Sequence, residues 1–168
     1  MATKLEQLVE LKEKYVAMMK NDGKEIITQW LLQLAEFIPD LEAFHWTQYT
    51  PYFNDGDACA FSVNSIYYFT YGMRNEWAAQ ESEAHKAALP VNELIYEDDG
   101  EYISSYSEMF KGKSELVNLL SDLVNLLSDN DELFEHAFDD HSRIIATAVR
   151  EDGKIVGFDY DVSEYNHD

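Results

Sequence analysis

Apolar residues recur with the period of an α-helix through the first forty positions of the chain. Thr3 and Glu6 form a capping-box pattern at the start of this stretch. Asn21-Asp22-Gly23 interrupts the pattern, and Pro39 ends it. We therefore expect two helices joined as a hairpin or one kinked helix, and the residues favour neither. The apolar positions are Leu5, Leu8, Val9, Tyr15, Met18 and Met19 before the interruption, and Ile27, Trp30, Leu31, Leu34 and Ile38 after it.

From residue 44 onward, aromatic and β-branched residues predict short strands. Residues 44–49 predict a strand, which is followed by a loop at residues 50–57. Cys59, Phe61 and Val63 alternate with small residues, which is typical of a half-buried strand and would place Cys59 in the core. Residues 66–71 predict another strand or the edge of an aromatic cluster, residues 76–88 a short helix, and residues 97–101 an acidic turn or loop.

Two identical heptads, Leu-Val-Asn-Leu-Leu-Ser-Asp, occupy residues 116–129. In a helix their leucines form one apolar stripe, while Asp122 and Asp129 face solvent. Two heptads fall short of the three or four expected of a coiled coil. We therefore interpret this segment as a helix packed on the sheet, with a homodimer contact as the alternative. Residues 131–138 predict another turn or two of helix.

The clearest strand pattern lies near the end of the chain. Residues 144–150 and 154–162 flank Glu151-Asp152-Gly153, and an Asp-Gly pair between alternating runs marks a hairpin. The predicted order is therefore helices, strands, a leucine-rich helix and a closing hairpin. This order predicts one α+β domain over residues 1–168, in which the N-terminal helices and the leucine-rich helix pack on an antiparallel sheet.

The chain carries 33 acidic and 12 basic residues, a formal net charge of −21, and residues 75–168 hold −17 of it. This charge exceeds what solubility needs and opposes compaction. It favours basic partners and disfavours direct contact with nucleic acid or an anionic membrane. No apolar run reaches the length of a membrane span, the N-terminus lacks a signal-peptide pattern, and the single cysteine cannot form an internal disulfide. We therefore expect a cytoplasmic location.

Two hypotheses of binding function follow from these features. The first is a nucleic-acid mimic, an inhibitor that occupies the basic groove of a DNA- or RNA-handling protein such as a host defence protein. The second is a protein-interaction or assembly module that uses an aromatic surface around Tyr49, Tyr52 and Phe53 together with the leucine-rich helix. The carboxylates expected to contact the partner of a mimic are Glu93, Glu97, Asp98, Asp99, Glu101, Glu108, Asp129, Asp131, Glu132, Glu135, Asp139 and Asp140.

Residues 46–57 combine aromatic rings with amide and carboxylate side chains. They form either a recognition loop or a turn shaped by Pro51 and Gly56, whose rings enter the core. The motif Trp-x-Gln-Tyr-Thr-Pro-Tyr-Phe-Asn-Asp-Gly, with Phe138-Asp-Asp-His141 and the acidic residues 161–168, resembles a group of uncharacterised small proteins of bacteriophages and bacteria. The resemblance implies a phage origin, with bacterial cytoplasm as the location, and it brings no activity with it.

A metal-dependent hydrolase would have to be built from Asp55, Asp57, His136 and His141. The two histidines lie five residues apart, which does not place them on one helix face. The acidic residues at 55 and 57 fail the EF-hand calcium pattern because apolar residues follow them. The sequence has no nucleophile elbow and no glycine-rich phosphate loop. We therefore expect no enzymatic activity, no metal and no cofactor.

Overall fold

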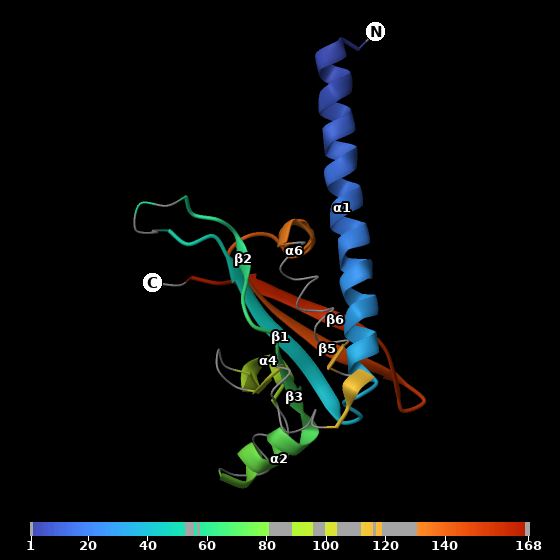
Figure 1. Cartoon of the computed structure of the whole chain (residues 1–168), viewed down its shortest axis with the longest axis vertical. Coiled ribbons are helices and arrows are strands. Elements are labelled where there is room, and N and C mark those ends of the chain that lie inside the picture. Colours follow the sequence, from blue (N-terminus) through green and yellow to red (C-terminus); the bar gives the residue numbers. More distant parts are fainter. Residues whose placement is uncertain are drawn as a thin grey trace.

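A computed structural model describes residues 2–52, 56, 58–80, 89–95, 100–103, 112–115, 117–118 and 131–166. A long N-terminal helix and a short helix late in the chain pack on one face of a six-stranded antiparallel sheet (Figure 1). The α+β class predicted from the sequence is confirmed. None of the helices within these ranges is both long enough and apolar enough to cross a membrane.

Helix α1 is a single helix of 32 residues, Lys4–Ala35, so the expected interruption at residues 21–23 is absent. Gly23 is buried inside the helix and faces α6 (Asp131–Phe138). A Cβ atom at this position would lie 3.2 Å from both Cδ1 and the carbonyl oxygen of Leu133. The glycine thus lets two helices approach closely and does not mark a break. The helix ends at Ala35, before the predicted limit at Pro39.

The sheet has the strand order β4-β3-β1-β5-β6, with β2 paired to β1. All pairings are antiparallel, and β1 occupies the centre. The strand predicted over residues 58–63 shrinks to its last two residues, and Cys59 is exposed, which corrects its predicted core position. The strands are β1 (Leu41–Tyr49), β2 (Ser62–Val63), β3 (Tyr67–Thr70), β4 (Glu101–Tyr102), β5 (Ser142–Glu151) and β6 (Lys154–Glu164).

The predicted C-terminal hairpin is confirmed. Strands β5 and β6 pair from Ser142↔Glu164 to Glu151↔Lys154, with Asp152 and Gly153 between them. Asp152 has φ 51° and Gly153 has φ 79°, the two left-handed residues that a tight two-residue hairpin requires. Strand β6 of this hairpin is an edge strand of the sheet.

The core lies on both faces of the sheet. On one face, Leu31 of α1 and Phe134 of α6 pack with Phe44 and Trp46 of β1. On the other face, α4 (Val91–Leu94) contributes Leu94 to a smaller cluster. Helix α2 (Tyr71–Gln80) begins five residues before its predicted start at residue 76. The two leucine heptads lie outside the described residues except for positions 117 and 118, as do residues 81–88 and 97–99.

Candidate interaction surfaces

The two halves of α1 have different surroundings. Residues 23–35 supply Gly23, Ile27, Leu31, Leu34 and Ala35 to the buried interior. Residues 4–19 extend past the sheet, and the N-terminus lies at the far tip (Figure 1). Because an α-helix rises 1.5 Å per residue, this projecting half is about 24 Å long. It is the most extended feature among the described elements.

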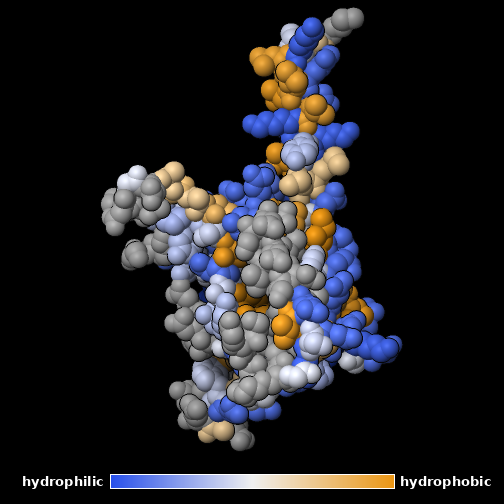
Figure 2. Space-filling view, in the orientation of Figure 1, coloured by the Kyte–Doolittle hydropathy of each residue, from blue (hydrophilic) through white to orange (hydrophobic). Residues whose placement is uncertain are grey.

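The projecting half carries an exposed apolar face. Figure 2 shows hydrophobic side chains gathered along this part of the helix, away from the body. Of the thirteen exposed large apolar side chains in the described part of the chain, seven lie here. A concentration of this kind marks an interaction site more often than a solvated surface. We call these seven residues the apolar face of α1: Leu5, Leu8, Val9, Leu11, Tyr15, Val16 and Met18, with exposed fractions of 39–72 %.

Four members of the apolar face form a narrower line, which we call the seam: Leu8, Leu11, Tyr15 and Met18. Their spacing of three, four and three residues is the spacing of helix–helix contacts. At 3.6 residues per turn, the seam points about 150° away from the core-facing side chains at 27, 31 and 34. The sheet that covers those residues therefore does not cover the seam.

The projecting half is held as a helix by local contacts. The backbone N–H of Thr3 donates to Glu6 Oε2 at 2.6 Å, and the N–H of Glu6 donates to Thr3 Oγ1 at 3.2 Å. Glu10 and Lys14 have the i, i+4 order that favours helices. An isolated helix of this length would be only marginally stable in water. Because it continues into residues 23–35, which are anchored in the core, it needs no separate nucleation. The apolar face is thus presented on a preformed helix.

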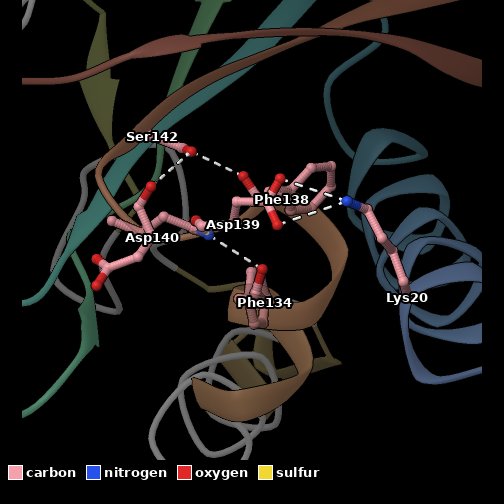
Figure 3. A network of polar contacts seen from close by, with 7 residues as sticks. Lys20, Phe134, Phe138, Asp139, Asp140 and Ser142 are labelled. Carbon is pink, nitrogen blue, oxygen red and sulfur yellow. Dashed lines mark hydrogen bonds and ion pairs between the residues drawn. The ribbon is translucent and has the colours of Figure 1, made fainter. Parts of the chain in front are cut away.

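The C-terminal end of α6, which Asp139 and Asp140 follow, is the acidic end of this helix. Two polar side chains of the sheet hold it in place (Figure 3). Gln48 is fully buried, and its Nε2 donates to the carbonyl oxygens of Phe134 at 3.0 Å and Asp139 at 2.7 Å. Ser142 Oγ donates to the carbonyl oxygen of Phe138 at 2.7 Å. These bonds satisfy carbonyl groups that the end of a helix leaves without partners. They place Asp139 just after the helix, with φ 65°.

Asp139 and Asp140 differ in what they can offer a partner. Asp139 is 74 % exposed, and its Oδ2 lies 3.3 Å from Lys20 Nζ on α1. Asp140 accepts hydrogen bonds from the backbone N–H and the hydroxyl of Thr50, at 2.8 and 2.7 Å, and from the N–H of His141. Burial raises the pKa of Asp140, but these bonds and the charge of His141 outweigh it and hold the pKa below its usual value. Asp140 therefore fastens the end of β1 to the end of α6.

The structure brings five of the predicted partner-binding carboxylates together at residues 131–140. Glu132 is exposed, while Asp131 and Glu135 are half-buried. Burial raises the pKa of Asp131, and a hydrogen bond from the backbone of Val63 offsets part of this rise. Glu132, Glu135 and Asp139 are the members of this group best placed to meet a partner.

The other predicted carboxylates are not part of this group. Glu93 is exposed on α4, which packs on the opposite face of the sheet. Glu101 on β4 accepts a hydrogen bond from the hydroxyl of Tyr68 at 2.6 Å. Burial, followed by this carboxylate, raises the pKa of Tyr68. Glu97, Asp98, Asp99, Glu108 and Asp129 lie outside the described residues.

The predicted aromatic surface is tied to the C-terminal part of the chain. The ring of Tyr49 lies 5.6 Å from that of Tyr165. Tyr52 is 68 % exposed and stacks on His141 with ring centres 4.9 Å apart. Trp46 of the same segment is buried in the core, and Phe53 lies outside the described residues. Tyr52 is thus a surface ring on an anchored turn.

The residues predicted as possible metal ligands either lie apart from one another or are not among the residues that the structure describes. His136 lies on α6, and His141 Nε2 lies 3.8 Å from Asp140 Oδ2. Asp55 and Asp57 fall outside the described positions. Across the positions that are described, no three His, Cys, Asp or Glu side chains converge as ligands of a metal ion would.

A cavity of about 230 Å³ lies on the face of the sheet opposite α1, where no sequence motif predicted one. His45, Thr47, Asn64, Tyr67 and Arg143 help to line it. Its volume is below the usual range for cofactor and drug-sized ligands. Two donors on its wall are used within the chain, because Asn64 Nδ2 donates to Thr47 Oγ1 and Arg143 donates to the carbonyl oxygen of Ile95. Its residues come from separate strands, so their proximity depends on strand register and leaves no local spacing in the sequence.

The helical pattern of the sequence includes Leu5, Leu8, Val9, Tyr15 and Met18 as apolar positions. It did not predict that these side chains are exposed. It also missed Leu11 and Val16. The available signal was the width of the apolar arc, which covers about half of the helix between residues 5 and 18. The core-facing arc of residues 27–34 is narrower and points elsewhere. An arc this wide exceeds what one packing surface covers.

A scan against protein-family models found no match, and neither the curated proteins nor the solved structures gave a significant match. The similarity noted for residues 46–56 therefore stays a prediction.

Proposed function

We propose that this protein is an interaction module that binds another protein chain through the apolar face of α1. The observation that carries the proposal is the exposure of seven large apolar side chains on one preformed helix. Burial of such a face in a helix groove or against another helix is a common mode of protein recognition. Because the helix is already formed, binding requires little further ordering of the backbone.

The helix is a better contact than the aromatic surface predicted from the sequence. Tyr49 and Tyr52 already pack against Tyr165 and His141, so part of their area is used within the chain. The apolar face of α1 lies on the half of the helix that extends past the sheet. A contiguous apolar area of this kind gives the desolvated centre that an interface needs.

Two matched double variants test the proposal. Leu8→Ser with Leu11→Ser should abolish the complexes of the 168-residue chain in sedimentation and chemical cross-linking, alone and in cell lysate. The control is Val156→Ser with Val162→Ser, which removes exposed apolar side chains from β6 and should leave these complexes intact. The proposal fails if the α1 variant retains every complex of the unmodified chain, or if that chain forms none.

A second candidate function is nucleic-acid mimicry, which the acidic end of α6 favours. Five carboxylates occur within residues 131–140. Three of them, Glu132, Glu135 and Asp139, are placed to meet a partner and form a row with spacings of three and four residues. Such a row can compete with DNA for a basic groove.

Mimicry is tested by neutralising the row. Glu132→Gln, Glu135→Gln and Asp139→Asn together should remove nucleic-acid-binding proteins from those captured in lysate at low salt. Glu151→Gln, Asp152→Asn and Glu164→Gln change the charge equally and should not remove them. High salt and added duplex DNA should release the captured proteins. Equal loss in both triple variants, or no effect of salt, would reject mimicry at α6.

A further inference from the structure

We infer that the partner of the apolar face of α1 is a second copy of this chain, paired with it as antiparallel helices. This inference rests on the proposed function and adds the identity and orientation of the partner. It follows from the charge of the helix, the order of residues along the seam, and the position of the helix relative to the body.

The projecting half of α1 is where two such acidic molecules can meet with least repulsion. Residues 4–19 contain three lysines and three glutamates, a net charge of zero, within a chain of net charge −21. The remainder of the chain therefore carries the whole −21. Charged groups attract or repel over about 8–10 Å at ordinary salt. A contact confined to this helix avoids opposing the two acidic bodies.

The seam is complementary to itself when two copies run in opposite directions. Extended by one step at each end, it reads Lys4, Leu8, Leu11, Tyr15, Met18 and Asp22. In an antiparallel pair, Leu11 meets Tyr15 of the second copy, and Leu8 meets Met18. Lys4 then meets Asp22, which places opposite charges at both ends of the apolar layers. In a parallel pair the same positions would place Lys4 against Lys4 and Asp22 against Asp22.

The surroundings of the helix also favour the antiparallel arrangement. Lys4 and Asp22 are both exposed, and Ile26, on the same side one turn further, is 41 % exposed. The approach of a second helix along this line is therefore open among the described elements. Opposite directions place the two bodies at opposite ends of a pair about 24 Å long, beyond the range of ionic interactions at ordinary salt. A parallel pair would bring them side by side.

The first measurement is the mass of the purified 168-residue chain by sedimentation equilibrium over a range of concentrations. We expect a reversible dimer that persists at about 0.5 M salt, where exposed ionic contacts are screened. Leu11→Glu should weaken it by about 100-fold or more, because a buried carboxylate would lie at two layers. Leu11 is 61 % exposed in the single chain, so helix content and the thermal stability measured below the concentration of dimer formation should stay unchanged.

The second measurement determines direction by charge reversal. Lys4→Glu or Asp22→Lys alone should weaken the dimer by about tenfold, since each places like charges together at both ends. The double variant Lys4→Glu with Asp22→Lys should restore it. In a parallel pair the double variant would restore nothing.

The outcomes separate this inference from the proposed function. A chain that stays monomeric at all concentrations, yet loses complexes with other proteins in the Leu8→Ser, Leu11→Ser variant, keeps the interaction module and overturns the dimer. A dimer unaffected by Leu11→Glu forms through another surface and overturns the inference. A dimer that responds to Leu11→Glu, but is not restored by the double charge reversal, overturns the antiparallel arrangement.

Discussion

Residues 4–19 and residues 23–35 belong to the same helix and contain similar numbers of large apolar side chains, but the fully buried ones, Ile27, Leu31 and Leu34, all lie in the second set. The second set lies over the sheet, next to α6. The first set continues past the sheet and keeps its apolar side chains in solvent. Amphipathic pattern alone therefore predicts a helix without deciding whether its apolar side stabilises the fold or binds a partner.

The largest expected contrast is between Leu31 and Leu11, which are 1 % and 61 % exposed. Leu31→Ala should lower the free energy of unfolding by about 2–5 kcal/mol, because it leaves a cavity in the core. Leu11→Ala should change it by less than about 0.5 kcal/mol. Urea unfolding of the two variants, at a concentration below that of dimer formation, measures both values. Equal losses would show that the projecting half is packed in solution.

Gly23 tests the junction between the halves. Gly23→Val should destabilise the protein by about 1–3 kcal/mol, because its side chain would press on Leu133 of α6. Asn21→Val, at an exposed position two residues away, controls for the poor helix propensity of valine. Thermal unfolding should separate the two variants. A similar melting temperature for both would mean that α6 moves aside without cost.

Asp140 tests the acidic end of α6 that packs on the anchored half. Asp140→Asn should cost about 1–2 kcal/mol at pH 7, since an amide replaces a carboxylate that accepts several hydrogen bonds. The folded pKa of Asp140 is lowered, so its stabilisation is present above the unfolded value near 4. It is lost as the pH falls through the lower folded value. The difference between the variant and the original chain should therefore vanish at strongly acidic pH.

The control for this pH profile is Asp152→Asn, at an exposed turn whose left-handed backbone asparagine tolerates. Its stability should follow that of the unmodified chain at every pH. A constant difference for Asp140→Asn down to pH 2 would mean that the effect is steric.

Lys20 lies where the two halves meet and has the smallest expected effect. Its ion pair with Asp139 joins side chains that are 47 % and 74 % exposed. Lys20→Met should change the free energy of unfolding by less than about 0.5 kcal/mol, and less still at high salt. Chemical unfolding at two salt concentrations checks this value. A loss above about 1 kcal/mol would show that the pair is shielded from solvent.

Local patterns predicted some elements well. The Asp152-Gly153 hairpin follows from backbone preferences of two residues, and the capping box at Thr3 follows from side-chain reach over one turn. Residues 131–138 form the expected helix. In each case the cause lies within a few residues of the effect.

Other features depend on contacts between distant segments, which one sequence does not display. Gly23 resembles a helix stop until Leu133 packs against it. Gln48 resembles a loop amide until it is buried beneath α6, 86 residues away along the chain. The apolar face of α1 has the sequence pattern of a buried helix face. Periodicity shows the spacing of apolar residues along the helix and not how far the sheet extends beside them. These sites are therefore visible only once the helix, sheet and α6 are placed together.

The close contact at Gly23 also gives the projecting half the mechanics of a lever. The arm from Gly23 to Lys4 is about 28 Å long, so a tilt of about 5° at the contact with α6 moves the tip by about 2.5 Å. A small change in how α1 packs on α6 therefore becomes a larger displacement at the far end of the helix. By the same leverage, a force on the tip of the helix is transmitted to the contact between Gly23 and Leu133.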